Sequence, residues 1–535
     1  MMKFLNINRG ERESIRFDKG RENKQQFNQF FLFVFIMMVI ILFVVLIFRL
    51  FQLTIVKGEY YKRLSEENRI KEITINPKRG SIIDRKGFVV VKNEPSEDKE
   101  NNDRLTSKRY YKSAEDIAHL VGYIQTADKT DIKNDICINK IKLGDKIGKK
   151  GIEKLYECDL RGKHGKKLVE TDAKGKQIKT ISIINPIDGK DIQLSFDWEL
   201  QKKAYELIKD NKAVIIASKP KTGEILVFVS SPSFSPQDFE NGNVKSIKKY
   251  FDDENKPLFN RITKGSYPPG SIFKLAIATG ALEEGKITEK TLIEDTGTIK
   301  AGPQTFGNWY FLEYGKVEGM VNILKAIKRS NDIYFYKAGE RLGVENIKKW
   351  AEILGYGEKT GIGFEESTGS IPSPFWKEEV IKEQWYLGDT YNLSIGQGYL
   401  LSTPLQVNQA TSVFANNGYL CPPEVLKISQ ENVNCTKLPI SKKTMSLIQE
   451  GMEQACEPKG TGWPFFDFKP RVACKTGTAE SFEGSGIPHA WFTMYAPVNN
   501  PEIVITVLIE EGGQGSDVAA PIAKQVLKAY FERKE

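Results

Sequence analysis

A serine and a lysine stand one helical turn apart in the segment YPPGSIFKLAIATGAL, residues 267–282. The Pro-Pro-Gly sequence ends one element, and a helix-forming run begins at Ser271. Ser271 and Lys274 are at positions i and i+3, so they share one face of the predicted helix. The apolar neighbours of Lys274 favour partial burial of its amine, which lowers the pKa and lets the neutral form act as a base. The helix dipole favours a developing anion at a serine near the helix start. We therefore interpret the pair as a candidate activated nucleophile.

The Ser-x-x-Lys spacing alone is a weak signal. It recurs at Ser96/Lys99, Ser218/Lys221 and Ser246/Lys249, each time in a polar, charged stretch without the apolar helical setting. The chain has only three histidines, and none of its six cysteines has CxxC or metal-ligand spacing. A Ser-His-Asp enzyme or a metalloenzyme is therefore disfavoured, and a Ser-Lys pair is the favoured nucleophile.

Two further polar elements follow along the chain. Ser330, Asn331 and Asp332 precede an aromatic run in KRSNDIYFY, residues 328–336. By itself such a group is more often a helix cap. Lys475-Thr476-Gly477-Thr478 lies on a predicted strand in RVACKTGTAES. The glycine lets a substrate approach the strand edge, while the lysine and threonines offer a cation and donors for a carboxylate.

A similar Lys221-Thr222-Gly223 sequence falls at a predicted hairpin turn between two apolar runs of residues 212–231, so we interpret it as a turn. After about residue 190, strands and helices mix without a regular βαβ rhythm, which indicates an α+β fold. The chain ends in two predicted strands, Ala490–Ala496 and Glu502–Glu510, and a helix from about residue 518.

The N-terminal part predicts a membrane protein. Residues 30–48 are 19 consecutive apolar residues, which at about 1.5 Å per residue nearly match a hydrocarbon core of roughly 30 Å. No small-residue cleavage site follows, so we expect an uncleaved anchor. Five Lys/Arg residues precede the span within twenty residues and four follow it, which barely favours a cytoplasmic N-terminus. Residues 49–72 have helix-like spacing, 73–91 are typical of strand, turn and strand, and 92–108 are polar and predict an exposed loop.

Composition excludes several classes of protein. The chain has 535 residues and is 40% hydrophobic and 11% aromatic, unlike a disordered, collagen-like or small disulfide-rich protein. Its net charge of +9 includes a basic stretch at residues 140–179. This stretch lacks the interleaved aromatics of nucleic-acid grooves, so we expect a solvated face and no nucleic-acid partner. The cysteines do not settle the redox compartment.

Taken together, the three elements resemble the class B penicillin-binding proteins, whose motifs are S-x-x-K (here 271–274), S-x-D (330–332) and K-T-G-T (475–478). RGSIIDRKG (79–87) and GIEKLYECDLRGKHG (151–165) resemble further family segments. The resemblance implies a cytoplasmic tail (1–29), a transmembrane anchor (30–48), a β-rich non-catalytic pedestal of the dimerisation type (49–190) and a transpeptidase domain (191–535). That last domain would have an antiparallel sheet with helices, as in serine β-lactamases.

Within class B, the chain most resembles the elongation-type penicillin-binding protein 2. Asp332 in the third position of the second motif, WYLGDTYNLSIGQGYLLSTPLQ (385–406) and HAWFTMYAP (489–497) carry this resemblance. Some relatives of that type hold zinc between the first two motifs. Here residues 275–329 contain no histidine or cysteine, so we carry over no metal. We regard His489 as a residue that packs or hydrogen-bonds beside the K-T-G-T strand and Trp491 as a core residue.

The resemblance implies a peptidoglycan D,D-transpeptidase that needs no cofactor, acts on stem peptides outside the membrane and is acylated by β-lactams. Ser271 would be the nucleophile and Lys274 its base. Ser330 and Lys475 would relay a proton, and Asp332 would orient one of the lysines. The residues expected to bind substrate are Thr476, Gly477 and Thr478. A polytopic glycan polymerase is the implied partner. A division-type transpeptidase and a non-catalytic scaffold of a wall-synthesis complex remain alternatives.

Overall fold

The computed structural model describes residues 22–95, 107–172, 175–429, 433–481 and 486–533. Most of the predicted tail, residues 1–21, lies outside these ranges, as do Ser96, Lys99 and most of the loop predicted at 92–108. The chain forms two compact units. One comprises the residues up to Thr74 together with Lys166–Ile184, and the other comprises Ile75–Gly165 and Asn185–Glu535. The boundary predicted between residues 190 and 191 falls inside the second unit and stays a prediction.

The first unit contains the long apolar helix α1 (Glu22–Phe51), a π-helical turn (Gln52–Val56) and α2 (Gly58–Arg69). Within the part of the chain that the structure describes, one helix is long and apolar enough to cross a membrane, and it spans Gln29–Val56 with no buried surface. It fits a single-pass membrane anchor and extends beyond the apolar run predicted at 30–48. A three-stranded sheet in the order β1-β7-β8 completes the unit: β1 (Ile70–Ile75), β7 (Gly165–Thr171) and β8 (Gln177–Ile184).

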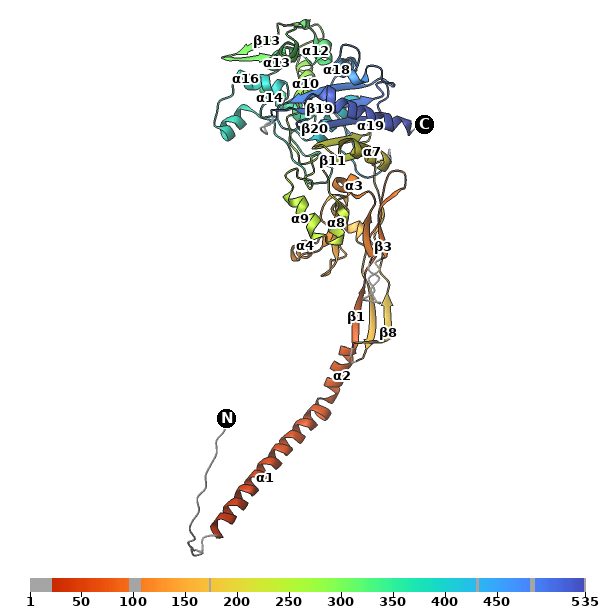
Figure 1. Cartoon of the computed structure of the whole chain (residues 1–535), viewed down its shortest axis with the longest axis vertical. Coiled ribbons are helices and arrows are strands. Elements are labelled where there is room, and N and C mark those ends of the chain that lie inside the picture. Colours follow the sequence, from red (N-terminus) through yellow and green to blue (C-terminus); the bar gives the residue numbers. More distant parts are fainter. Residues whose placement is uncertain (1–21, 96–106, 173–174, 430–432, 482–485, 534–535) are drawn as a thin grey trace, which may run out of the picture. The chain divides into compact units, whose positions relative to one another are not determined.

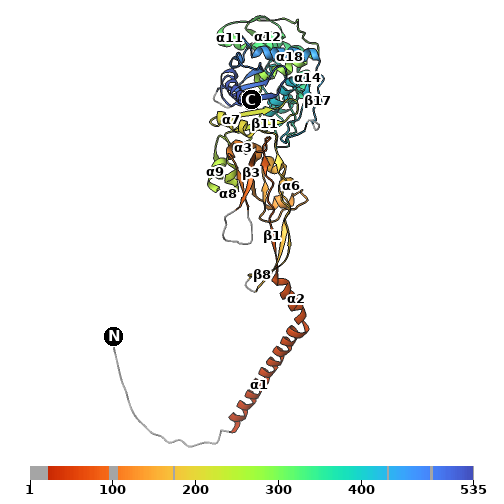
Figure 2. The ribbon, with the colours of Figure 1, turned by 90° about the vertical axis from the view of Figure 1, so that its right-hand side faces the viewer.

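The N-terminal part of the second unit is built on short strands. β4, β3, β2 and β9 form a sheet in that order, and β5 pairs with β6. Their bounds are β2 Ile82–Ile83, β3 Val89–Pro95, β4 Ser107–Tyr111, β5 Ile124–Thr126, β6 Lys146–Gly148 and β9 Ile192–Gln193. The helices here are α3 (Ala114–Val121), α4 (Lys129–Lys133), α5 (Gly151–Leu155), α6 (Glu157–Leu160), α8 (Pro236–Asn241) and α9 (Val244–Asp252). Figures 1 and 2 both show α8 and α9 beside α3. Residues 92–95, predicted as loop, belong to β3, which pairs with β4.

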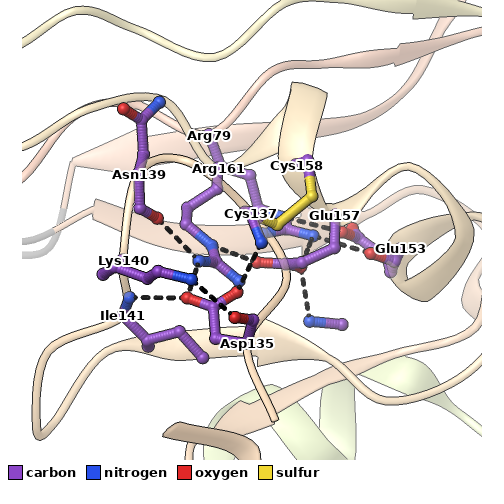
Figure 3. Close-up of a disulfide and its surroundings, with 11 residues drawn as sticks. Arg79, Asp135, Cys137, Asn139, Lys140, Ile141, Glu153, Glu157, Cys158 and Arg161 are labelled. Atoms are coloured by element: carbon purple, nitrogen blue, oxygen red, sulfur yellow. Dashed lines mark hydrogen bonds and ion pairs between the residues drawn. A yellow bond between two sulfur atoms is a disulfide. The ribbon is translucent and has the colours of Figure 1, made fainter. Parts of the chain in front are cut away.

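Buried ion pairs connect two segments that the sequence analysis singled out, residues 79–87 and 151–165. Arg79 donates to Glu153 and to Glu157, both at 2.6 Å. Arg161 donates to Glu157 at 2.8 Å and to Asp135 at 2.7 Å, beside the Cys137–Cys158 disulfide (Figure 3). The segments 79–87 and 151–165 therefore meet in one charge network.

Asp84 and Arg85 are neighbours in the sequence, but their side chains bond to different groups. Asp84 accepts from the backbone N–H groups of Lys86, Phe88 and Trp198, whereas Arg85 donates to the carbonyl of Ser195. Asp84 therefore holds its own turn and the start of α7.

A five-stranded sheet organises the rest of the second unit. Its order is β11-β10-β20-β19-β18, and each neighbouring pair is antiparallel. The strands are β10 (Ala213–Ser218), β11 (Ile225–Ser231), β18 (Ala473–Ala479), β19 (His489–Ala496) and β20 (Ile503–Ile509). The predicted 212–231 hairpin and the two C-terminal strands are confirmed. The α+β prediction is confirmed as well, because helices cover this antiparallel sheet.

Each face of the sheet supports a separate apolar core. Alternate side chains of β10, such as Ala213 and Ile215, pack with α7 (Trp198–Ile208) and α19 (Ala520–Glu532). Val214 and Ile216 join the opposite core, as the period-two alternation of a strand requires. Figure 1 shows α7 and α19 beside the sheet strands β11 and β20. The helices of the second core are α10 Lys274–Glu283, α12 Ile323–Arg329, α13 Asp332–Leu342, α14 Val344–Ile353, α16 Leu387–Ser394, α17 Pro404–Ala415 and α18 Lys442–Ala455.

Smaller elements surround the second core. The paired strands are β12 (Ile293–Asp295) with β15 (Gly319–Val321), β13 (Thr298–Ala301) with β14 (Gln304–Gly307), and β16 (Tyr419–Leu420) with β17 (Thr436–Lys437). The short helices are α11 (Trp309–Tyr314) and α15 (Pro374–Trp376). The remaining turns are 3₁₀ at Gly270–Ile272 and Trp463–Phe465 and π at Lys377–Ile381 and Gly515–Ala519.

Candidate active site

A cleft of about 1280 Å³ lies along the exposed edge of β18. Five of the residues singled out in the sequence line it: Ser271, Ser330, Asp332, Thr476 and Thr478. Lys274 and Lys475 have no exposed surface. The structure therefore brings the three sequence motifs together, although they are separated by more than 50 and 140 residues along the chain.

Ser271 lies in the 3₁₀ turn Gly270–Ile272, and α10 begins at Lys274. The prediction that the helix begins at Ser271 was therefore wrong. The turn is seated tightly between two elements. The Gly270 N–H donates to the carbonyl of Gly396 at 2.9 Å. A Cβ on Gly270, whose φ is +55°, would lie 2.8 Å from the carbonyl oxygen of Thr478. Only glycine fits there, and the close approach holds the serine next to β18.

Lys274 donates hydrogen bonds to two residues of the second motif, Ser330 and Asp332. Its Nζ donates to Asp332 Oδ1 at 2.6 Å, to the Ser330 carbonyl at 2.8 Å and to Ser330 Oγ at 3.3 Å. The lysine is also 5.6 Å from the centre of the Phe335 ring. Hydrogen bonds from Lys274 thus connect the first motif to the start of α13.

Lys475 reaches the same serine from β18. Its Nζ donates to Ser330 Oγ at 2.8 Å and to the carbonyl of Thr476 at 3.1 Å. The Ser330 hydroxyl therefore lies between two buried amines. A hydroxyl can accept one proton and donate another, so this position suits a proton relay.

Burial lowers the pKa of both amines. Desolvation lowers the pKa of Lys274, and the carboxylate of Asp332 opposes that shift. Burial and the charge of Lys274 lower the pKa of Lys475 well below its ordinary value, again against Asp332. Two cations and one carboxylate cannot balance in a water-poor site, so a neutral amine is favoured.

The substrate-binding candidates differ in exposure. Thr478 is exposed on β18, while Thr476 and Gly477 are buried. Thr476 Oγ1 donates to Thr461 Oγ1 at 2.9 Å. A Cβ on Gly477 would lie 3.2 Å from the Pro269 carbonyl oxygen, so the glycine lets β18 approach the segment before the nucleophile.

The two residues held apart from the chemistry behave as predicted. His489 is buried, and its Nδ1 accepts from the backbone N–H of Glu511 at 3.1 Å. Trp491 is fully buried and donates to the Pro268 carbonyl at 3.0 Å. Both predictions are confirmed.

Sequence reasoning missed several residues that shape the cleft. The Trp309 N–H donates to Asp332 Oδ2 at 2.8 Å, and Asn308 Oδ1 accepts from the Asp332 N–H at 3.0 Å. Gln397 Nε2 donates to the Thr478 carbonyl at 3.3 Å. Asn308 and Trp309 carry no local pattern that marks them. Gln397 stands in a Gly-x-Gly sequence within a segment whose family resemblance was noted, which was the available signal.

Six cysteines form three disulfides: Cys137–Cys158, Cys421–Cys435 and Cys456–Cys474. The third joins the end of α18 to β18, one residue before Lys475. The short connection after Cys456 includes Gly460, Thr461 and Trp463, which line the cleft. In the described ranges, no group of three or more His, Cys, Asp or Glu residues could hold a metal ion.

Comparisons with known proteins found matches over most of the chain. The family described as "Penicillin binding protein transpeptidase domain" matches residues 213–528, and "Penicillin-binding Protein dimerisation domain" matches residues 102–194. A relative named peptidoglycan D,D-transpeptidase MrdA, from Salmonella typhimurium, is 30% identical, with 91% of this chain and 93% of the relative covered.

Two solved structures are similar over most of the chain. Penicillin-binding protein 2 of Helicobacter pylori, in a complex with MreC, has a TM-score of 0.76 and 30% identity over 86% of this chain and 99% of that one. A chain from a structure titled "Structural coordination of polymerization and crosslinking by a peptidoglycan synthase complex" has a TM-score of 0.75 and 27% identity. That match covers 96% of this chain and 99% of the other.

Proposed function

The chain belongs to the class B penicillin-binding proteins and is a serine-type peptidoglycan D,D-transpeptidase, and we propose that the residues gathered around Ser330 carry out its acyl transfer. The proposed nucleophile is Ser271 and its base is Lys274. Ser330 and Lys475 move the proton, and Asp332 orients Lys274. The observation that carries this assignment is the hydroxyl of Ser330 between two buried amines, beside the cleft that Ser271 lines.

In the first step, Ser271 Oγ attacks the carbonyl carbon of the penultimate D-Ala of a stem peptide. Neutral Lys274 takes the hydroxyl proton, as general-base catalysis requires. The tetrahedral intermediate collapses, and terminal D-Ala leaves with a proton delivered through Ser330 and Lys475. An amine of a neighbouring stem peptide then attacks the acyl-enzyme, loses its proton to the same groups and releases Ser271. These steps need no cofactor.

The edge of β18 supplies the binding groups in this proposal. Backbone N–H groups of Ser271 and Thr478 stabilise the oxyanion, and loss of one such donor typically costs about 10²–10³ in rate. Thr476 and Thr478 hold the terminal carboxylate, while Gly477 leaves room at the strand edge. β-Lactams acylate Ser271 as mimics of the stem peptide.

The catalytic domain is proposed to lie outside the membrane, where peptidoglycan is built. Three disulfides support this placement, because such bonds persist in oxidising compartments and are rare in the cytosol. The anchor would then leave residues 1–29 in the cytoplasm. The numbers of basic residues on the two sides of the span are nearly equal, so they contribute little to the choice of orientation.

We assign the enzyme to wall elongation, in complex with a polytopic glycan polymerase. Its relatives' names, MrdA and penicillin-binding protein 2, support the elongation role, as does Asp332 in the second motif. The titles of the two similar structures, one with MreC and one of a peptidoglycan synthase complex, support assembly with other proteins.

Intact-mass spectrometry tests the assignment of the nucleophile. Detergent-solubilised full-length chain is incubated with a penicillin, wild type beside Ser271→Ala. We expect one covalent adduct on the wild type and none on the variant. Ser246→Ala, in a decoy Ser-x-x-Lys sequence, serves as the matched control and keeps the adduct. An adduct on Ser271→Ala would assign the nucleophile elsewhere, and a folded wild type without an adduct would favour a scaffold.

A further inference from the structure

Asp295 is a buried carboxylate that lies outside the cleft yet is bonded to the second motif. It ends β12 and is 1% exposed. It is not among the residues that line the cleft. A carboxylate without an exposed surface is costly unless several donors satisfy it. Its partners therefore indicate what it holds in place.

Four N–H donors surround the Asp295 carboxylate. Oδ1 accepts from the Gly297 N–H at 2.8 Å. Oδ2 accepts from Asn308 Nδ2 and Asn331 Nδ2, both at 2.8 Å, and from the Glu318 N–H at 3.1 Å. All four donors are uncharged. Asp295 thus ties together β12, the residue before α11, the segment leading into β15 and the start of α13.

The two side-chain amides are the link to the chemistry. Because each amide donates through its nitrogen to Asp295, its oxygen must point the other way and accept. The Asn308 oxygen accepts from the Asp332 N–H at 3.0 Å, and the Asn331 oxygen accepts from the Tyr334 N–H at 2.8 Å and caps α13. Asp295 therefore fixes the orientation of both amides.

These contacts fix the backbone on both sides of Asn331. Ser330 adopts a left-handed conformation with φ +53°, which a residue other than glycine keeps only when its surroundings hold it. Asp332 is held through its N–H by Asn308 and through Oδ2 by the Trp309 N–H. Its remaining oxygen, Oδ1, is left to face Lys274 at 2.6 Å.

From this chain of contacts, we infer that Asp295 is a positioning residue for acyl transfer. It sets the places of Ser330 and Asp332, and through Asp332 it sets the protonation of Lys274. The inference rests on the proposed roles of Ser271 and Lys274. The charged groups that face Lys274 are Asp332 and Lys475, so a displaced Asp332 leaves the repulsion of Lys475 unopposed.

The test compares full-length wild type with Asp295→Asn, which has nearly the same shape. The Asn side chain brings an N–H₂ group toward donors, so it cannot accept all four bonds. The second-order rate of acylation by a fluorescent penicillin is measured from pH 5 to pH 10. We expect a rate at least about tenfold lower. We also expect the midpoint of the pH profile to fall by about one unit, since a carboxylate near a lysine raises its pKa by about that much or more.

Glu153→Gln is the matched control. Glu153 is also a buried carboxylate, and it accepts from Arg79 and Arg109. It lies in the charge network that joins residues 79–87 to residues 151–165, not near Asp295. We expect this control to lose thermal stability and to keep the acylation rate and midpoint of wild type. Asn308→Ala is a second variant, in case Asp295→Asn does not fold. It removes the links to Asp295 and to the Asp332 N–H, and we expect the same shift of the midpoint.

A folded Asp295→Asn or Asn308→Ala protein with the wild-type midpoint and rate would overturn the inference. So would a loss of rate that only follows the unfolded fraction and leaves the midpoint unchanged. Failure of the proposed function looks different, because wild type itself would then show no adduct, or Ser271→Ala would keep one.

Discussion

Lys274 and Lys475 are both fully buried. One carboxylate, that of Asp332, accepts a hydrogen bond from Lys274 and acts on Lys475 through its charge. Burial disfavours an ammonium, and a nearby carboxylate favours it. At Lys274 these two effects oppose each other: burial lowers the pKa, and Asp332 raises it. A base with a lowered pKa is neutral over more of the physiological pH range, and this is the state that can accept the proton of Ser271.

Asp332→Asn tests this balance at the residue scale. The substitution removes the counter-charge, so the pKa of Lys274 falls further and the amine is neutral at lower pH. Because acylation requires the neutral amine, the rate rises with pH through this pKa. We expect the midpoint of that rise to move down by about one pH unit or more. The measurement is the rate of acylation by a fluorescent penicillin from pH 5 to pH 9.

Asp389→Asn is the control for this experiment. Asp389 lines the same cleft but pairs with Lys377 at 2.8 Å, away from the two buried amines. Its variant should keep the wild-type midpoint. A midpoint that moves to higher pH in Asp332→Asn would contradict the proposed role of the carboxylate.

Residue types and spacing in the sequence pointed to the side chains that the structure brings together around Ser330, because the spacing within each motif is local. Ser271 and Lys274 are one turn apart, and the apolar neighbours of Lys274 predicted its burial. Asp295 and Asn308 could not be found in this way. They act on Asp332 from 37 and 24 residues away in the sequence, through contacts that only the folded arrangement of β12, β14 and α13 creates.

At the scale of elements, periodicity identified the longer strands and helices, such as β10, β11 and β18. It misplaced the start of α10, because the Pro-Pro-Gly sequence is followed by a 3₁₀ turn that seats Ser271 against β18. The pairing of the cysteines could not be predicted from the sequence either. Cys456 and Cys474 are 18 residues apart, and only the packing of α18 beside β18 brings them together.

The Cys456–Cys474 disulfide fixes an element of the cleft. It closes the segment that carries Thr461, whose hydroxyl accepts from Thr476, and it ends one residue before Lys475. We expect the double variant Cys456→Ser/Cys474→Ser to lower the free energy of unfolding by about 3 kcal/mol, the typical value for a loop of this length. We also expect about tenfold slower acylation. Denaturant unfolding and acylation kinetics measure the two effects.

Cys421→Ser/Cys435→Ser is the matched variant for this comparison. Its loop is similar, with a separation of 14 residues, and none of the loop residues that the structure describes lines the cleft. It should lose a similar stability and keep the acylation rate. Equal losses of rate in both double variants would show that the Cys456–Cys474 bond has no special role at the site.

At the scale of the whole molecule, the region that matches the dimerisation domain and the region that matches the transpeptidase domain meet, within the second unit, at a polar joint. Gln201 of α7 donates to the carbonyl of Asp116 on α3 and to the carbonyl of Phe228 on β11. Asp116 itself is buried, and its Oδ1 has no hydrogen-bond partner within the described residues. Burial raises the pKa of Asp116 to about 8, against the opposing charge of Lys202.

This joint makes stability depend on pH in a definite direction. Between its unfolded pKa of about 4 and the folded value of about 8, the folded chain keeps a proton on Asp116 that the unfolded chain has released. Stability therefore falls as pH rises through this window. Asp116→Asn removes the titrating group, so its stabilising effect should grow from pH 5 to pH 8. Thermal unfolding of the full-length protein in detergent at both pH values measures it.

Glu115→Gln separates this effect from a general change of charge on α3. Glu115 is the neighbouring residue, but its side chain is exposed and accepts from the Tyr205 hydroxyl at 2.9 Å. Its variant should change the unfolding temperature by similar amounts at pH 5 and pH 8. If Asp116→Asn also shows equal shifts at the two pH values, the carboxyl is ionised in the folded protein, and the joint holds a charge rather than a proton.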